Sequence, residues 1–179
     1  MLRHWLHSLL APAPAPNLRA TAASPLDLSM MARALELARA AAAIGEVPVG
    51  AVVYNHTTGQ IISEAHNRRE TDHDPAAHAE LIAIRAAAAS QSDWRLNHLS
   101  LAVTLEPCCM CAGTIINARI GRLIFAARDP KAGFCGSLQS LTQHPALNHR
   151  IQPIEGPLAS ESSTLLKEFF KARRSKPKT

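Results

Sequence analysis

The chain has 179 residues, of which 47% are apolar and 18% are charged. This length and apolar content suit one packed domain, and they exclude a disordered chain and a second domain of ordinary size. No run of about 18 apolar residues lacks a charged residue, which excludes a membrane-spanning helix. We therefore expect a soluble, cytoplasmic protein with no membrane partner.

Positive charge is concentrated at the C-terminal end of the chain. The formal net charge is +5, and residues 165–179 alone contribute +5, whereas residues 1–27 contribute +1 and residues 28–164 contribute −1. A basic tail on a nearly neutral body attracts phosphate groups through counterion release, which points to nucleic acid as a partner. A solvated chain end that aids solubility explains the same charge.

The first 27 residues are expected to form a disordered extension rich in proline and alanine. Prolines alternate with alanines over residues 11–16, and repeated proline forbids a helix there. Arginines and small residues, with no acid before Asp27, are also typical of an organelle transit peptide. An upstream start codon that adds residues without structure is a third interpretation of this segment.

After this extension the sequence alternates between helical and strand patterns. The first helix has Ser29 as its candidate N-cap and ends at Gly45. In chain order, the predicted elements are a helix over residues 28–45, strands at Val49–Tyr54 and Gln60–Glu64, a helix from His78 to Ala88, a strand at Leu99–Leu105, a helix at Cys108–Ala118, a strand at Arg122–Ala126 and a helix from Leu158 to about Arg173.

This order of elements predicts an α/β fold. The first two strands form a hairpin, and the later strands alternate with helices, so they need crossover connections that make them parallel. Helices on both faces of the sheet then give a three-layer α/β/α sandwich around a mixed sheet of about five strands. The loop from Arg128 to about Pro145 is longer than most loops in compact domains, so we expect it to serve a site.

The four cysteines and one histidine indicate a metal site. Three cysteines fall within residues 108–111, and such clustered thiols cannot join distant parts of a chain by disulfides, which suggests metal ligands in a reducing compartment. Cys108 and Cys111 lie three residues apart at a helix start, so both can bind one ion together with His78 at the start of another helix. Three protein ligands leave the fourth position of a zinc ion open to water, as in catalytic sites.

Other interpretations of these residues stay open at this point. A CxxC pair also occurs in redox sites and in half of a structural zinc ribbon. Cys109 and Cys111 offer a second way to form the thiolate pair, although the spacing of three residues favours Cys108. Cys135 is expected to be an ordinary loop or core thiol.

Glu80 is the candidate acid and base. Two thiolates cancel the charge of a zinc ion, so the ion acidifies its water less than an all-histidine site does, and a nearby base becomes necessary. Glu80 lies two residues after His78, close enough to move protons between water and a substrate. His78 and Glu80 as HxE, about 30 residues before the PCxxC segment, match the signature of zinc-dependent deaminases.

The segments around these motifs resemble the bacterial tRNA-specific adenosine deaminases, a family of the cytidine-deaminase-like superfamily. The resemblance runs from about Met30 to Arg174, which places a zinc-dependent deaminase domain at residues 28–174 and a basic tail at residues 175–179. The matching segments are Gly45–Val53, Asp74–Glu80, Val103–Cys108, Met110–Gly113, Ala118–Arg122, Arg128–Gly133, Leu147–His149, Phe169–Phe170 and Arg173–Arg174.

The resemblance implies hydrolytic conversion of adenosine to inosine at the wobble position of a tRNA anticodon, by a homodimer with one Zn2+ per chain. The site residues that it implies are His78, Cys108 and Cys111 for zinc, Glu80 for proton transfer, Asn67 for the purine, and Asp129 and Lys131 for the anticodon stem-loop.

Two other functions stay open. One is a deaminase of a free base, guanine or cytosine, which shares the zinc motifs but has no use for a basic tail. The other is a non-catalytic RNA-binding module that keeps zinc for stability alone.

Overall fold

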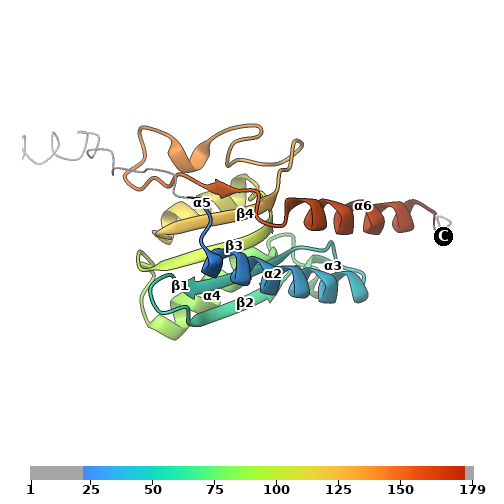
Figure 1. The fold of residues 1–179 in the computed structure, drawn as a ribbon, viewed down its shortest axis with the longest axis horizontal. Helices are drawn as coiled ribbons and strands as arrows, with labels where there is room; N and C mark the ends of the chain where they lie inside the picture. Colours follow the sequence, from blue (N-terminus) through green and yellow to red (C-terminus); the bar gives the residue numbers. More distant parts are fainter. Residues whose placement is uncertain (1–21, 176–179) are drawn as a thin grey trace, which may run out of the picture.

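The computed structural model describes residues 22–175, and a five-stranded sheet forms its centre (Figure 1). The strand order is β2-β1-β3-β4-β5, where β1 is antiparallel to β2 and to β3, and β3, β4 and β5 run parallel. The predicted mixed sheet is therefore confirmed. The strands are β1 (Gly50–Asn55), β2 (Ile61–His66), β3 (Leu99–Leu105), β4 (Arg122–Ala127) and β5 (Ile154–Glu155).

Helices cover both faces of this sheet, which confirms the predicted three-layer sandwich (Figure 1). Helices α4 (Ala79–Gln91) and α5 (Cys109–Asn117) pack on one face, and helices α2 (Pro25–Ala43) and α6 (Ala159–Ser175) lie on the other. Alternate strand residues serve the two cores: Leu101 and Val103 contact the α4 and α5 side, whereas Ala102 contacts the α2 side. Among residues 22–175, no helix combines the length and the apolar character needed to cross a lipid bilayer.

Helix α2 begins earlier than the sequence pattern predicted. The expected N-cap, Ser29, lies within the helix, and the N-cap is Ser24, whose hydroxyl accepts a hydrogen bond from the Asp27 N–H while the Asp27 carboxylate accepts one from the Ser24 N–H. This capping box, followed by Pro25 at the first helical position, fixes the start. Residues 25–27, which were expected in the extension, thus form the first turn, while residues 1–21 and 176–179 lie outside the described residues.

Asp27 also joins α2 to the sheet. Its buried carboxylate accepts hydrogen bonds from the Tyr54 hydroxyl on β1 and from the Arg122 guanidinium on β4. Burial raises the pKa of Asp27, but the hydrogen bonds from Tyr54 and Ser24 and the charge of Arg122 outweigh it, so the pKa lies below its ordinary value. The carboxylate is therefore charged in the folded protein at neutral pH.

Gly50 allows α2 to pack closely against β1. A Cβ atom at this position would lie 2.1 Å from the Ala34 carbonyl oxygen and 2.8 Å from the Ala38 nitrogen. No side chain fits in that space, so only glycine lets the helix backbone approach the start of the strand this closely.

Three short elements were not predicted, and one of them is the two-residue strand β5. Helix α3 (Arg69–Asp72) lies in the polar loop that was expected over residues 66–77, and a 3₁₀ turn (Leu141–Gln143) lies in the long loop after β4. The expected helices at His78 and Cys108 each begin one residue later, because these two residues are the N-caps of α4 and α5.

Candidate active site

One edge of the sheet gathers the ends of four strands. β3 and β4 end there, where Leu105 pairs with Ala127, and β2 ends there at His66, which pairs with Gly50 at the start of the antiparallel β1. Since α4 and α5 follow segments that leave this edge, both helices begin beside it. Their N-terminal N–H groups carry partial positive charge, which favours thiolates and other anions at the edge.

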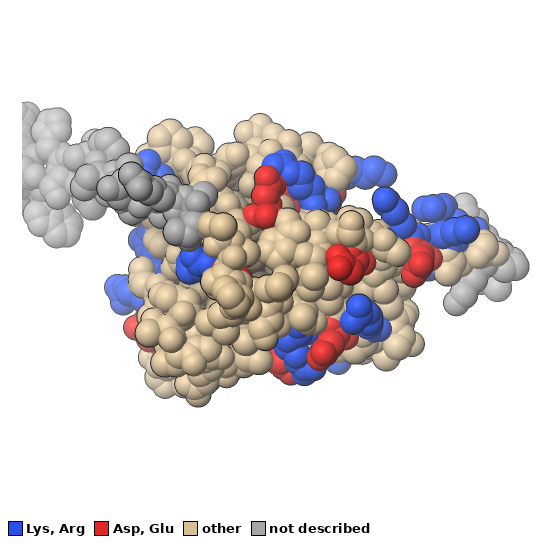
Figure 2. Space-filling model, in the orientation of Figure 1, with Lys and Arg blue, Asp and Glu red and all other residues tan. Residues whose placement is uncertain are grey.

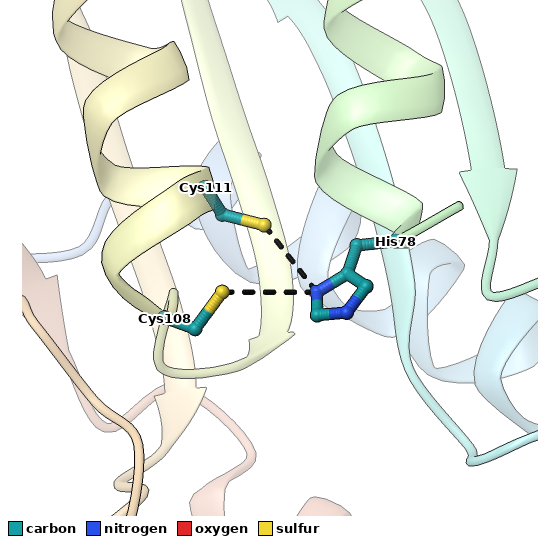
Figure 3. Close-up of side chains that lie close together, drawn as sticks. All are labelled: His78, Cys108 and Cys111. Carbon is teal, nitrogen blue, oxygen red and sulfur yellow. Dashed lines mark hydrogen bonds between the residues drawn. The ribbon is translucent and has the colours of Figure 1, made fainter. Parts of the chain in front are cut away.

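His78, Cys108 and Cys111 come together at this edge (Figure 3). His78 Nδ1 lies 3.8 Å from the Sγ atom of Cys108 and 3.5 Å from that of Cys111, and the three ligand atoms lie within 4.8 Å of one another. Tetrahedral zinc, with its usual bond lengths, separates a nitrogen ligand from a sulfur ligand by about 3.6 Å. The side chains therefore fit a single zinc-sized ion with only small movements.

The other two cysteines do not belong to this group. Cys109 follows Cys108 directly but is exposed, and Cys135 is buried in the core on the α4 and α5 side of the sheet. Within residues 22–175, no second group of three histidine, cysteine or acidic side chains gathers closely enough to hold an ion. The geometry thus favours the pair Cys108 and Cys111 over the pair Cys109 and Cys111.

The two candidate ligand thiols have very different acidities. A hydrogen bond with Cys111 lowers the pKa of Cys108 to about 3, with further help from His78, and these effects outweigh burial. The same hydrogen bond, together with burial, raises the pKa of Cys111. The pair therefore loses its two protons at well-separated pH values, and binding of a cation by both sulfurs releases the second proton.

Glu80 lies in the first turn of α4, beside the metal group. The side chain is buried, with 4% of the residue exposed, and this burial raises the pKa of its carboxyl group. A carboxyl group with a raised pKa can both accept and return a proton near neutral pH. Its position and acidity suit proton transfer at a reacting centre.

A cavity of about 460 Å³ opens next to these residues, and both His78 and Glu80 line it. This volume is in the range of pockets that bind small ligands or single bases. Apolar walls come from Val47, Val49 and Leu105 near the sheet edge, and Leu166 and Phe170 of α6 add a further wall.

Asn67 lines the cavity and also caps α4. The residue is 5% exposed, and its amide oxygen accepts a hydrogen bond of 2.9 Å from the N–H of Ala79. This bond commits the oxygen to the helix start and leaves the amide N–H groups as donors available to a ligand. The family resemblance implied a purine contact at Asn67, and the structure adds the helix contact.

Asp129 and Lys131 lie in the loop after β4, and both line the cavity. The Asp129 carboxylate accepts hydrogen bonds from the N–H groups of Lys131 at 2.9 Å and Ala132 at 3.1 Å, so this side chain shapes the turn that carries it. Lys131 is exposed at the surface. The loop therefore borders the site, as its length suggested.

Comparison with known proteins identifies the family. The family described as MafB19-like deaminase matches residues 27–174. The chain belongs to this deaminase family. The tRNA-specific adenosine deaminase of Bacillus subtilis is 42% identical over 152 residues, covering 85% of this chain and 93% of the relative. The protein of the same name from Haemophilus influenzae is 45% identical over 155 residues, covering 87% and 89%.

Solved structures agree with the assignment of this chain to the deaminase family. A structure from a study of A-to-I editing by tRNA:A34 deaminases at the wobble position of transfer RNA has a TM-score of 0.73 and 40% identity, covering 77% of this chain and 99% of that one. A guanine deaminase from Nitrosomonas europaea has a TM-score of 0.70 and 26% identity, covering 89% and 95%. The predicted cytidine-deaminase-like fold is confirmed.

Several cavity residues of the deaminase were missed in the sequence. Glu106 lies between an apolar strand and Pro107, where an isolated charge was a usable signal, whereas Arg69 gave none. Phe170 and Arg174 also line the cavity, and both lie in segments that the family resemblance had already singled out. Near the cavity, the guanidinium nitrogen Nη1 of Arg173 in α6 lies 3.6 Å from the carboxylate oxygen Oε1 of Glu70 in α3. Figure 2 shows basic side chains gathered toward the C-terminal end of α6.

Proposed function

We propose that this protein converts adenosine to inosine by hydrolysis at the wobble position of a tRNA anticodon. The observation that carries the proposal is a group of three side chains that could hold a metal ion beside a buried carboxyl group, in a cavity large enough for one base. The names of the relatives at 42% and 45% identity support adenosine in tRNA as the substrate.

His78, Cys108 and Cys111 are proposed to hold one Zn2+ per chain. The donor set and the distances given above suit zinc, and three ligands leave one position open. When bound, zinc acts as a Lewis acid that polarises a water molecule and lowers its pKa. Two thiolate ligands moderate this effect, which is why the reaction also needs a base.

Glu80 is proposed to be the catalytic acid and base. Its carboxylate accepts a proton from the attacking water, which adds through oxygen to C6 of adenine, and returns that proton to the ring nitrogen. Glu80 then accepts the proton of the hydroxyl group added at C6 and passes it to the amino group, so that the C6=O bond forms as the exocyclic C6–N bond breaks and the products are inosine and ammonia. Burial among His78, Cys111 and the cavity walls keeps bulk water from competing for these protons.

The cavity is proposed to receive the adenine after it leaves the anticodon stack. The amide N–H groups of Asn67 suit the ring nitrogens of a purine, which are acceptors, and the apolar walls suit the faces of the base. Asp129 and Lys131 would contact the surrounding anticodon stem-loop, together with the basic end of α6. The proposal also includes a homodimer that acts in the cytoplasm.

Sequencing of an anticodon stem-loop after incubation with the purified protein tests this proposal. Adenosine at the wobble position should be read as guanosine, because inosine pairs like guanosine. A stem-loop with adenosine moved to another loop position is the matched control and should stay unchanged. Ammonia release from free guanine, with no inosine in either RNA, would instead support the activity of the guanine deaminase neighbour.

A further inference from the structure

The loop of residues 128–137 borders the cavity, and it contains almost no regular secondary structure. It carries Asp129 and Lys131, so its shape determines where these side chains meet a ligand. A loop without a ladder of hydrogen bonds needs other groups to satisfy its backbone N–H groups. In this protein one carboxylate accepts three of these bonds, more than any other side chain accepts from the loop.

Glu106 is the residue that holds this loop. Its carboxylate accepts hydrogen bonds from the backbone N–H groups of Asp129 at 3.0 Å, Cys135 at 3.0 Å and Ser137 at 2.9 Å, and from the Ser137 hydroxyl. The residue is only 2% exposed, so little water is available to replace these bonds. Three N–H groups spread over nine residues of loop therefore converge on one side chain.

The loop packs closely against the side chain of Glu106. Gly133 passes so close that a Cβ atom there would lie 2.3 Å from the Glu106 carboxyl carbon and 2.6 Å from the Asp129 carbonyl oxygen. Gly133 also forms an isolated β-bridge with Cys108. The loop thus lies directly on the chain that carries a candidate metal ligand.

The position of Glu106 in the sequence couples the two parts of the site. It follows β3 and precedes Pro107 and Cys108, so its backbone belongs to the segment that starts α5. Its side chain is joined by hydrogen bonds to the loop of residues 128–137, which also lines the cavity. Movement of either the segment that starts α5 or the loop of residues 128–137 therefore changes the distance between the loop and the metal group.

We propose that Glu106 is a positioning residue for the deaminase reaction, which holds the loop of residues 128–137 so that Asp129 and Lys131 meet the substrate RNA beside the metal group. This inference rests on the proposed function. The carboxylate oxygens of Glu106 are engaged by the loop, so its loss should reduce RNA affinity before it reduces the rate of the chemical step.

Substitution of Glu106 by Gln and by Asp tests this inference by steady-state kinetics on the anticodon stem-loop. The amide group of Glu106→Gln cannot accept the hydrogen bonds that one carboxylate oxygen accepts, so KM should rise about tenfold while kcat changes little. Glu106→Asp keeps the carboxylate and should recover part of the loss. Zinc content should stay at one ion per chain in both variants.

Asp27→Asn is the matched control, since it changes another buried carboxylate, on the opposite face of the sheet and away from the cavity. It should lower the melting temperature and leave KM unchanged. If Glu106→Gln behaves in the same way, Glu106 has only a structural role and the inference is wrong.

Hydrogen exchange provides a readout that does not depend on the substrate. In Glu106→Gln the N–H groups of Asp129, Cys135 and Ser137 should exchange faster than in the wild type, whereas those of α4 and α5 should not change. Unchanged exchange in the loop would overturn the inference about Glu106. A wild-type protein that forms no inosine would instead overturn the proposed function, so the two failures are distinguishable.

Discussion

The metal group and the cavity walls are held in different ways. His78, Cys108 and Cys111 lie at the starts of helices whose buried faces pack on the sheet, so the core fixes their positions. Two polar parts of the walls depend instead on hydrogen bonds to buried carboxylates: Glu106 holds the loop after β4, and Glu46 accepts bonds from the Thr71 N–H at 2.7 Å and hydroxyl at 2.8 Å in α3.

Because of this difference, we expect the helix ends to serve the chemical step and the hydrogen-bonded loops to serve recognition of the substrate. Groups on packed helix ends keep a fixed geometry, which suits proton transfer and metal binding. Loops that depend on a few hydrogen bonds can differ between related proteins without loss of the core. We therefore expect changes in the metal group to remove activity and changes in the walls to alter affinity for RNA first.

Replacement of Cys108 by Ser should have the largest effect. Loss of one thiolate from a three-ligand site should reduce bound zinc from one ion per chain to almost none, abolish deamination and lower the melting temperature. Metal analysis and thermal unfolding measure these effects. Cys109→Ser is the matched control, because this exposed neighbour lies outside the ligand group and should retain both zinc and activity.

Replacement of Glu80 by Ala should remove turnover and keep the metal. Loss of a general acid and base slows a reaction by about 10²- to 10⁴-fold. The zinc content should remain at one ion per chain, because Glu80 is not among the three ligands. Single-turnover assays beside metal analysis measure both quantities, and activity close to that of the wild type would show that Glu80 has another role.

Truncation after Phe170 should weaken RNA binding by a smaller factor. The change removes five basic residues at positions 171–179 but keeps Phe170 in the cavity wall. Affinity for the stem-loop should fall roughly tenfold at moderate salt, with a shallower dependence on salt concentration, since fewer counterions are released.

A shorter truncation, after Arg174, provides the control for charge. It removes two of the five basic residues and should cause a correspondingly smaller loss. Equal affinity of all three proteins at every salt concentration would show that the basic end of the chain does not contact RNA.

The smallest effect on activity is expected at Asp27, on the far face of the sheet. Its pKa is lowered in the folded protein, so the charged form adds stability above its ordinary pKa of 3.8, and this stability is lost as the pH falls through the lower folded value. At pH 6, the free energy of unfolding of Asp27→Asn should be about 1.5–3 kcal/mol lower than that of the wild type. Urea titrations should show this difference shrinking in acid, and a difference that grows as the pH falls would contradict the assignment.

The metal group and Glu80 could be located from the sequence because their positions depend on local structure. HxE and PCxxC each fall at a helix start, and topology brings both starts to one sheet edge. The start of α2 was readable in the same way from the S-x-x-D pattern at Ser24 and Asp27, but the proline-rich composition around it led to the wrong N-cap, Ser29.

The cavity walls could not be predicted, because they depend on contacts between distant segments. Glu106 meets donors 23 to 31 residues further along the chain, and Glu46 meets α3 24 to 25 residues further along. Strand β5 has two residues and helix α3 has four, which is too short for any periodic pattern. A hydrogen-bonded loop leaves no repeat in the sequence that could indicate its shape.

X-ray absorption at the zinc edge of the purified protein tests the central claim most directly. We predict one nitrogen donor, two sulfur donors near 2.3 Å and one solvent oxygen donor, as three protein ligands and an open position require. A coordination shell with three sulfur donors, or with four protein ligands of any kind, would contradict the account, because no position would then remain for the attacking water.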